Sequence, residues 1–176
     1  MRGLLPGLLL LLLVVPAACG GDDSGEPAAK RTQAKTSAEP SPSAQREALK
    51  DTSTKPVIPK PSGSPPRKLD KQDIVKGKGP AAKPGDTLTV NYVGVAFSTG
   101  DEFDASWDRG QPFEVPLGAG RVIPGWDKGL VGMRKGGRRM LTIPPELAYG
   151  SDGYPPTIAP NETLVFVIDV LDIKPG

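Results

Sequence analysis

The chain has 176 residues, enough for one domain with length to spare, and its 22 basic and 20 acidic residues leave a net charge of +2, too little to indicate a nucleic-acid partner. It contains no histidine, which excludes histidine-based acid–base chemistry and the commonest metal ligand. A single cysteine excludes an intrachain disulfide and a zinc site built from several thiolates.

Residues 1–19 have the pattern of an export signal. One arginine precedes an apolar run over residues 4–15 that is too short to span a bilayer, and small residues follow before Cys19. This resembles the signal of bacterial lipoproteins, in which the cysteine is lipidated and becomes the mature N-terminus. Pro16 departs from that pattern, so an ordinary secretory signal is the alternative. We expect a protein anchored through Cys19 on the outer face of the bacterial cytoplasmic membrane or, on the alternative, a secreted one.

Residues 20–68 are rich in Ala, Pro, Ser, Thr and Lys and offer little to bury. Between residues 26 and 68, Leu49, Val57 and Ile58 are the only branched aliphatics. Such a segment cannot offset its ordering entropy, so we expect it to be disordered and extended by its prolines. It is either a spacer that lifts a domain from the membrane or an inert tail.

The expected folded domain is residues 69–176, which is enough for one core. Residues 87–92 alternate polar and apolar side chains, as a half-buried strand does. Val93, Val95 and Phe97 continue in the opposite register, which predicts a β-bulge near residues 92–94. Residues 98–101 then form a turn.

Three further strands are predicted. Residues 113–117 alternate, and residues 138–143 are stopped by two prolines. Residues 163–173 are apolar at nearly every position, which indicates a strand covered on both faces or in the middle of a sheet. Because strands outnumber helices and the helix comes late, the pattern predicts an α+β domain with an antiparallel sheet.

Residues 121–133 form the one convincing amphipathic helix of the second half. Pro124 suits its first turn, whereas glycines at 125, 129 and 132 weaken it, so packing must hold it. Its apolar side chains recur on one face: Ile123, Trp126, Leu130 and Met133. The simplest architecture wraps one sheet around this helix, with Trp126 facing the concave side.

Several short motifs follow one another from about Ile74 to the C-terminus: Val90-Asn91-Tyr92-Val93-Gly94, Gly100-Asp101-Glu102-Phe103-Asp104-Ala105-Ser106, Val122-Ile123-Pro124-Gly125-Trp126, Gly132-Met133, Leu141-Thr142-Ile143-Pro144-Pro145, Ala148-Tyr149-Gly150 and Leu164-Val165-Phe166. In this order and spacing they resemble the FKBP-type peptidyl-prolyl cis–trans isomerases. The resemblance implies a half-barrel of antiparallel strands around one short helix, with a shallow apolar cavity between them.

The resemblance also implies which residues form that cavity. By position they are Tyr92, Phe103, Asp104, Phe113, Val122, Ile123, Trp126, Tyr149, Ile158 and Phe166. Trp126 would be the floor, and the other aromatic residues apart from Tyr149 would be the walls. The Ile123 N–H and the Tyr149 hydroxyl would donate to substrate carbonyls, and Arg109 would pair with Asp104.

The chemistry of prolyl isomerisation suits a chain without histidine. Resonance sets a rotation barrier of roughly 18–20 kcal/mol about a peptide bond, and no bond is broken, so neither a nucleophile, a metal nor a cofactor is needed. A dry aromatic pocket disfavours the charge-separated planar amide, and donors that fit only the twisted amide add to this. A barrier lowered by ~5–6 kcal/mol corresponds to about 10⁴-fold acceleration.

Each residue also has a plainer explanation. Periodicity alone favours ordinary core for Trp126, Phe166 and Val122. Asp104 could cap a turn, and Tyr149 could be a surface tyrosine. Only the motifs taken together favour a role in the cavity over these plainer explanations.

Three positions depart from the family. Arg121 replaces a common Glu, Tyr154 a His found in some members, and Thr157 a common aliphatic, which leaves the preference for the residue before proline open. We expect a monomeric isomerase that acts on proline-containing exported polypeptides and binds the macrolide immunosuppressants that the family recognises. The alternative is a proline-segment binding module or chaperone with little turnover.

Overall fold

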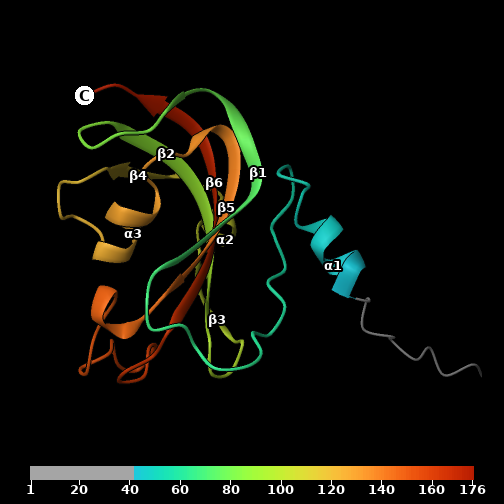
Figure 1. The fold of residues 1–176 in the computed structure, drawn as a ribbon, viewed down its shortest axis with the longest axis vertical. Coiled ribbons are helices and arrows are strands. Elements are labelled where there is room, and N and C mark those ends of the chain that lie inside the picture. The colour runs from blue at the N-terminus through green and yellow to red at the C-terminus, as the bar shows by residue number, and fades with distance from the viewer. Residues whose placement is uncertain (1–41) are drawn as a thin grey trace, which may run out of the picture. The chain divides into compact units, whose positions relative to one another are not determined.

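The computed structural model describes residues 42–176, and all strands within this range belong to one antiparallel sheet (Figure 1). The strand order is β1 (Asp70–Ala81), β5 (Arg134–Ile143), β6 (Leu164–Lys174), β2 (Thr87–Ala96) and β3 (Glu102–Ala105), with β4 (Phe113–Pro116) also paired to β2. The predicted α+β class with an antiparallel sheet is confirmed. The predicted signal, Cys19 and the first part of the spacer lie outside the described residues.

β6 occupies the centre of the sheet, as its continuous apolar run predicted. It pairs with β5 on one side and with β2 on the other, and its residues 164–170 are all buried. Phe166 and Ile168 enter the core cluster on the concave side, whereas Val165 and Val167 enter a second cluster on the other face. The strand is therefore apolar throughout because both of its faces are covered.

β2 does not contain the predicted bulge. Val90 and Tyr92 face the concave core, and Val93 and Val95 belong to the cluster on the convex face. The register shifts beside β2 fall between Thr89 and Val90 against β6, and between Gly94 and Val95 against β3. The change of apolar register in the sequence therefore marks a strand that becomes covered on its second face.

The predicted helix lies in the concave side of the sheet as α3 (Pro124–Gly129), shorter than expected (Figure 1). Pro124 is in its first turn, as predicted. The helix ends early because Arg139 of β5 donates to the carbonyls of Gly129 and Val131, at 2.6 and 3.1 Å, in place of another helical turn. Arg134 and Lys135, which directly follow the predicted helix in the sequence, begin β5.

Two glycines let α3 lie directly on β5. A Cβ at Gly125 would come within 2.3 Å of Ile143 Cγ2, and one at Gly129 within 2.5 Å of Leu141 Cδ1. Neither distance is tolerable for a real side chain, so these glycines weaken the helix but allow its close packing. Packing therefore holds the helix, as the sequence indicated.

Several elements were not predicted from the sequence. β1 is a charged edge strand with mostly exposed residues, which hides the alternation on which strand prediction relies. The helices α1 (Pro42–Ala48) and α2 (Ser106–Arg109) and the 3₁₀ turn η1 (Pro145–Leu147) are short. Among residues 42–176, no helix is long and apolar enough to cross a membrane.

The expectation of disorder was wrong for the described part of the spacer. Residues 42–62, here named the strap, run along the convex face of the sheet, opposite α3 (Figure 1). Leu49 and Ile58 are only 5% and 9% exposed, and they cluster with Val93, Val95, Ala105, Val165 and Val167. Two of the segment's three branched aliphatics therefore suffice as anchors, because the sheet offers an apolar surface for them.

A buried arginine fastens the strap. Arg138 of β5 is fully buried and donates to the carbonyls of Leu49 and Asp51, both at 2.9 Å, and of Thr54 at 3.1 Å. Its remaining donors meet the carboxylate of Asp169 on β6 at 2.5 and 2.7 Å. Every N–H of the guanidinium is thus satisfied, which a buried charge requires. The folded unit therefore begins well before residue 69.

Candidate active site

A cavity of about 560 Å³ opens on the concave side of the sheet beside α3. Nine of the predicted site residues line it: Tyr92, Phe103, Asp104, Phe113, Val122, Ile123, Trp126, Tyr149 and Phe166. They come from β2, β3, β4, β6, α3 and the loops around α3 and after η1. The fold thus brings together residues that lie far apart in the sequence.

Trp126 is the centre of an aromatic cluster. Its ring centroid lies 5.1 Å from that of Tyr92, 5.3 Å from Phe166 and 6.3 Å from Phe113, with interplanar angles of 75–87°. Phe103 meets Phe166 in the same edge-to-face way at 5.5 Å. This geometry suits the quadrupoles of the rings and fixes their orientations, so the walls of the cavity are rigid.

Gly94 makes room for this cluster on β2. A Cβ at this position would lie 2.7 Å from atoms of both the Phe103 and the Phe166 rings. Any side chain here would separate the two rings from the strand, so the glycine of the Val-Asn-Tyr-Val-Gly motif is required by packing.

One polar network borders the apolar cavity. The Tyr92 hydroxyl donates to Asp104 Oδ2 at 2.5 Å, and Arg109 pairs with Asp104 Oδ1 and donates to the Tyr92 hydroxyl at 2.7 Å. The Arg109 guanidinium also lies 5.6 Å from the centroid of the Tyr92 ring. Burial, with help from Asp104, raises the pKa of Tyr92 to about 12, so this hydroxyl keeps its proton at neutral pH.

Besides the buried indole N–H of Trp126, two donors of cavity-lining residues have no intramolecular acceptor in the described part of the chain. They are the backbone N–H of Ile123 and the hydroxyl of Tyr149. Tyr149 is 39% exposed, and its ring lies 5.7 Å from that of Tyr154. Burial and the nearby Asp104 raise the pKa of Tyr149, so its hydroxyl is a donor at neutral pH. Both groups can therefore donate to a ligand carbonyl.

The structure places Ile158 differently from the prediction and Arg109 in agreement with it. Ile158 is 5% exposed and belongs to the core cluster, but it does not line the cavity. Arg109 does not line it either and acts on it only through Asp104 and Tyr92, which fits the supporting position expected of it. Gly120 and Ala148 line the cavity and were missed. Ala148 belongs to a recognised motif and Gly120 precedes the predicted helix, but small side chains carry no chemical signal of their own.

The residues that depart from the family are also placed. Arg121 lines the cavity, whereas Tyr154 and Thr157 are exposed and do not line it. Within the described part of the chain, no three or more His, Cys, Asp or Glu side chains are grouped so that they could hold a metal ion.

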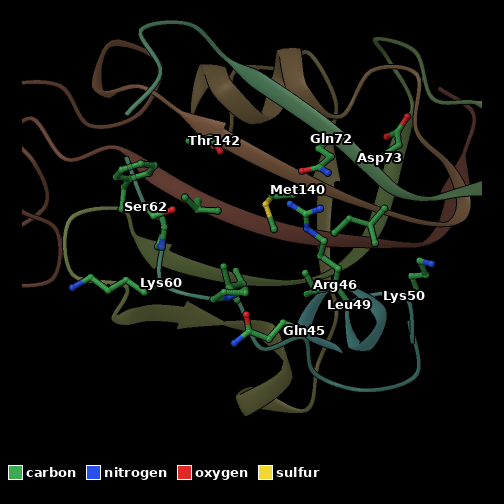
Figure 2. Close-up of a pocket in the computed structure, with 16 residues that line it drawn as sticks. Gln45, Arg46, Leu49, Lys50, Lys60, Ser62, Gln72, Asp73, Met140 and Thr142 are labelled. Atoms are coloured by element: carbon green, nitrogen blue, oxygen red, sulfur yellow. The ribbon is translucent and has the colours of Figure 1, made fainter. Parts of the chain in front are cut away.

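A larger cavity, of about 750 Å³, lies on the convex face (Figure 2). Figure 2 shows Gln72, Met140 and Thr142 of the sheet on one side of it and Gln45, Lys60 and Ser62 of the strap on the other. Phe97 is its one aromatic residue, and it contains neither the tyrosine donors nor the aspartate network. The concave cavity is therefore the candidate active site.

Residues 79–171 match the protein family described as FKBP-type peptidyl-prolyl cis-trans isomerase, and this stretch is more than half of the chain. The chain belongs to this family. The prediction from the motifs is thus confirmed, and with it the class of enzyme. The concave cavity with its aromatic floor is this FKBP domain's candidate for the site of isomerisation.

Relatives of this FKBP include two bacterial proteins of similar domain length. The FK506-binding protein of Streptomyces anulatus is 56% identical over 120 residues, which are 68% of this chain and 97% of that protein. A probable FK506-binding protein of Corynebacterium glutamicum is 50% identical over 117 residues, 66% of this chain and 97% of that protein. The FKBP-type isomerase FkpA of Escherichia coli K12 is 51% identical over 105 residues, but these are only 37% of its length.

The fold has a solved counterpart. The crystal structure of AtFKBP13 superimposes with a TM-score of 0.55 at 40% sequence identity, covering 59% of this chain and 91% of that one. The FKBP-like half-barrel around a short helix, expected from the motifs, is thereby confirmed.

Proposed function

We propose that the concave cavity catalyses cis–trans isomerisation of X–Pro bonds by desolvating the amide and stabilising its twisted form. One observation supports this proposal: an aromatic cavity and two donors without intramolecular acceptors occur in the same site. The donors are the Ile123 N–H and the Tyr149 hydroxyl. A prolyl ring placed over Trp126 would leave its neighbouring carbonyls within reach of these donors. No covalent step is required.

The apolar walls act on the ground state. A planar amide owes its barrier of roughly 18–20 kcal/mol to a charge-separated resonance form, which an environment without water stabilises poorly. Twisting removes that charge separation, so the twisted amide loses less on entering the cavity. The aromatic cluster around Trp126 excludes water and supplies this difference.

The polar groups act on the transition state. In the proposed pose the Ile123 N–H and the Tyr149 hydroxyl donate to substrate carbonyls in the geometry that the twisted amide adopts. Asp104 supplies a fixed dipole beside the rotating carbonyl, and Arg109 holds that carboxylate in place. Each contributes through orientation, so each is worth a modest part of the total acceleration.

The natural substrates we propose are proline-containing polypeptides exported from the cytoplasm. Uncatalysed prolyl isomerisation takes tens to hundreds of seconds, slow enough to limit folding. Macrolides of the FK506 type are proposed as competing ligands, because relatives at 50–56% identity are named FK506-binding proteins. A proline-like ring of such a ligand would occupy the space over Trp126.

A lipid anchor at Cys19 is proposed from the sequence alone. The apolar run and the small residues before the only cysteine support it. In the native host, Cys19→Ser is expected to move the protein from the membrane fraction to the soluble fraction. Partitioning that does not change in this variant would contradict lipid anchoring.

The proposed activity is tested by NMR exchange spectroscopy on an X–Pro peptide, which measures interconversion of the two isomers directly. We expect the wild-type chain to accelerate exchange and the macrolide FK506 to abolish the acceleration. Peptide resonances that shift on binding without faster exchange would favour the binding-module alternative.

A further inference from the structure

The segment made by β3 and α2, residues 102–109, forms one border of the candidate site. β3 lies at the edge of the sheet and pairs only with β2. Within the domain the main polar anchor of the segment is Ser106, whose hydroxyl accepts from the Tyr92 N–H at 2.9 Å and donates to Asn91 Oδ1 at 3.1 Å. Yet the segment carries three side chains of the site: Phe103, Asp104 and Arg109.

One strap residue holds both ends of this segment. Lys55 Nζ lies 2.8 Å from Glu102 Oε1, at the start of β3, and 2.7 Å from Asp108 Oδ1, near the end of α2. Hydrogen bonds to Asp108 and Glu102 raise the pKa of Lys55, and its ammonium group in turn lowers the pKa of Asp108. The Lys55 side chain is 34% exposed, and those of Glu102 and Asp108 are 36% and 59% exposed, so water screens much of the attraction. Lys55 therefore bridges two carboxylates on either side of Phe103 and Asp104.

The strap holds Lys55 in a fixed place. The carbonyl of the preceding residue, Thr54, accepts a hydrogen bond from the buried Arg138 at 3.1 Å. Three residues further on, Ile58 is buried in the cluster against which Trp107 of α2 packs. The backbone on both sides of Lys55 is thus held against the sheet, and this restrains the position of the ammonium group.

We propose that Lys55 is a positioning residue of this isomerase, which braces residues 102–109 so that Phe103 and Asp104 hold their places in the cavity. This inference rests on the proposed function of the concave cavity. Lys55 lies before residue 79, where the match to the family begins, so the brace lies outside the stretch that this match covers. Exposed ion pairs add little to global stability, so the expected effect is on the geometry of the site.

The first test compares Lys55→Met with the wild-type full chain. Methionine keeps most of the aliphatic stem and removes the charge. We expect kcat/KM for an X–Pro peptide to fall about three-fold, with little change in the thermal unfolding midpoint. Lys55→Arg should restore most of the activity because it preserves the charge, a rescue that a merely space-filling role would not show.

The matched control is Lys50→Met in the same strap. Lys50 pairs with Glu47 at 2.7 Å, a contact within the strap that does not reach β3 or α2. This variant should keep wild-type kcat/KM. A second route to the same loss is the double variant Glu102→Gln with Asp108→Asn, and adding Lys55→Met to it should cost nothing further because the brace is already gone.

Hydrogen exchange of the backbone amides of residues 102–109 separates this inference from the proposed function. We expect faster exchange there in Lys55→Met than in Lys50→Met, whether or not the chain turns over substrate. A wild-type chain without isomerase activity would overturn the proposed function alone. Unchanged exchange of these amides in Lys55→Met, or an active wild type whose kcat/KM this variant leaves intact, would overturn the brace.

Discussion

The two faces of the sheet are covered in opposite ways. On the concave face, large aromatic side chains meet edge to face and leave an open cavity of about 560 Å³ over Trp126. On the convex face, a mostly polar strap is held by two buried aliphatics, Leu49 and Ile58, and by the backbone carbonyls that Arg138 binds. Contacts between side chains cover the concave face, whereas the strap on the convex face is held largely through its main chain.

That difference separates what each face can do. Aromatic walls with donors that lack intramolecular acceptors create a place for a ligand, and a change there should affect turnover first. A buried cation that binds main-chain oxygens holds one segment of the chain against another, and a change there should lower the free energy of unfolding first. The predictions below are arranged to break one face while leaving the other intact.

The largest effect is expected from Arg138→Met. This change leaves the carboxylate of Asp169 buried without its cation and three carbonyls without their donor, so unfolding free energy should fall by about 3–5 kcal/mol. Urea denaturation measures this loss of unfolding free energy. The control is Lys135→Met on the same strand, because the pair of Lys135 with Asp172 is exposed and its loss should cost less than about 0.5 kcal/mol. Equal losses in the two variants would show that Arg138 does not fasten the strap.

Removing the strap altogether should cost less than breaking its fastening. A chain that begins at Leu69 loses the buried side chains of Leu49 and Ile58 but lets water reach Arg138 and Asp169. We expect it to fold and to be less stable by about 2–4 kcal/mol than a chain that begins at residue 42, since the two buried aliphatics contribute roughly 1.5–3 kcal/mol each and the entropy lost on ordering the strap offsets part of this sum. Equal urea midpoints for the two chains would mean that the strap contributes nothing.

On the concave face, Tyr149→Phe and Asp104→Ala should each lower kcat/KM by about 1–2 kcal/mol of transition-state stabilisation. Each removes one hydrogen bond or dipole and leaves the aromatic cluster in place, so urea midpoints should stay near the wild-type value. Wild-type turnover in both variants would mean that the shape and dryness of the cavity provide all of the catalysis.

The smallest effect is expected from pH. The chain has no histidine, and burial raises the pKa of Tyr92 to about 12 and raises that of Tyr149. The protonated Tyr92 hydroxyl favours the folded state fully below the unfolded tyrosine pKa of about 10, and this contribution is lost as the pH rises through about 12. We therefore expect kcat/KM to be flat between about pH 6 and 9. A bell-shaped profile in that range would indicate an acid–base step that the cavity does not provide.

The sequence predicted the concave face far better than the convex one. Tyr92, Trp126 and Phe166 lie in motifs with strong spacing, and all line the cavity. Ile158 was assigned to the cavity, but a buried apolar residue can face the core as readily as the cavity, and sequence alone does not distinguish the two.

The convex face had no comparable signal. The strap is low in apolar content, and its order depends on partners more than eighty residues away, chiefly Arg138. Its trace in the sequence was the apolar pair Val93 and Val95, which signalled a covered second face and was interpreted as a bulge. Composition measures what a segment can bury by itself, not what another surface offers it.

The most direct test of the concave site is the fluorescence of Trp126 under a titrated ligand. A Trp107→Phe background removes the second tryptophan, which lies in α2 on the other cluster. We predict that a proline peptide and FK506 each change the Trp126 emission, and that FK506 does so at the concentrations at which it inhibits isomerisation. A folded, catalytically active protein whose Trp126 emission ignores both ligands at saturation would show that the reaction takes place elsewhere.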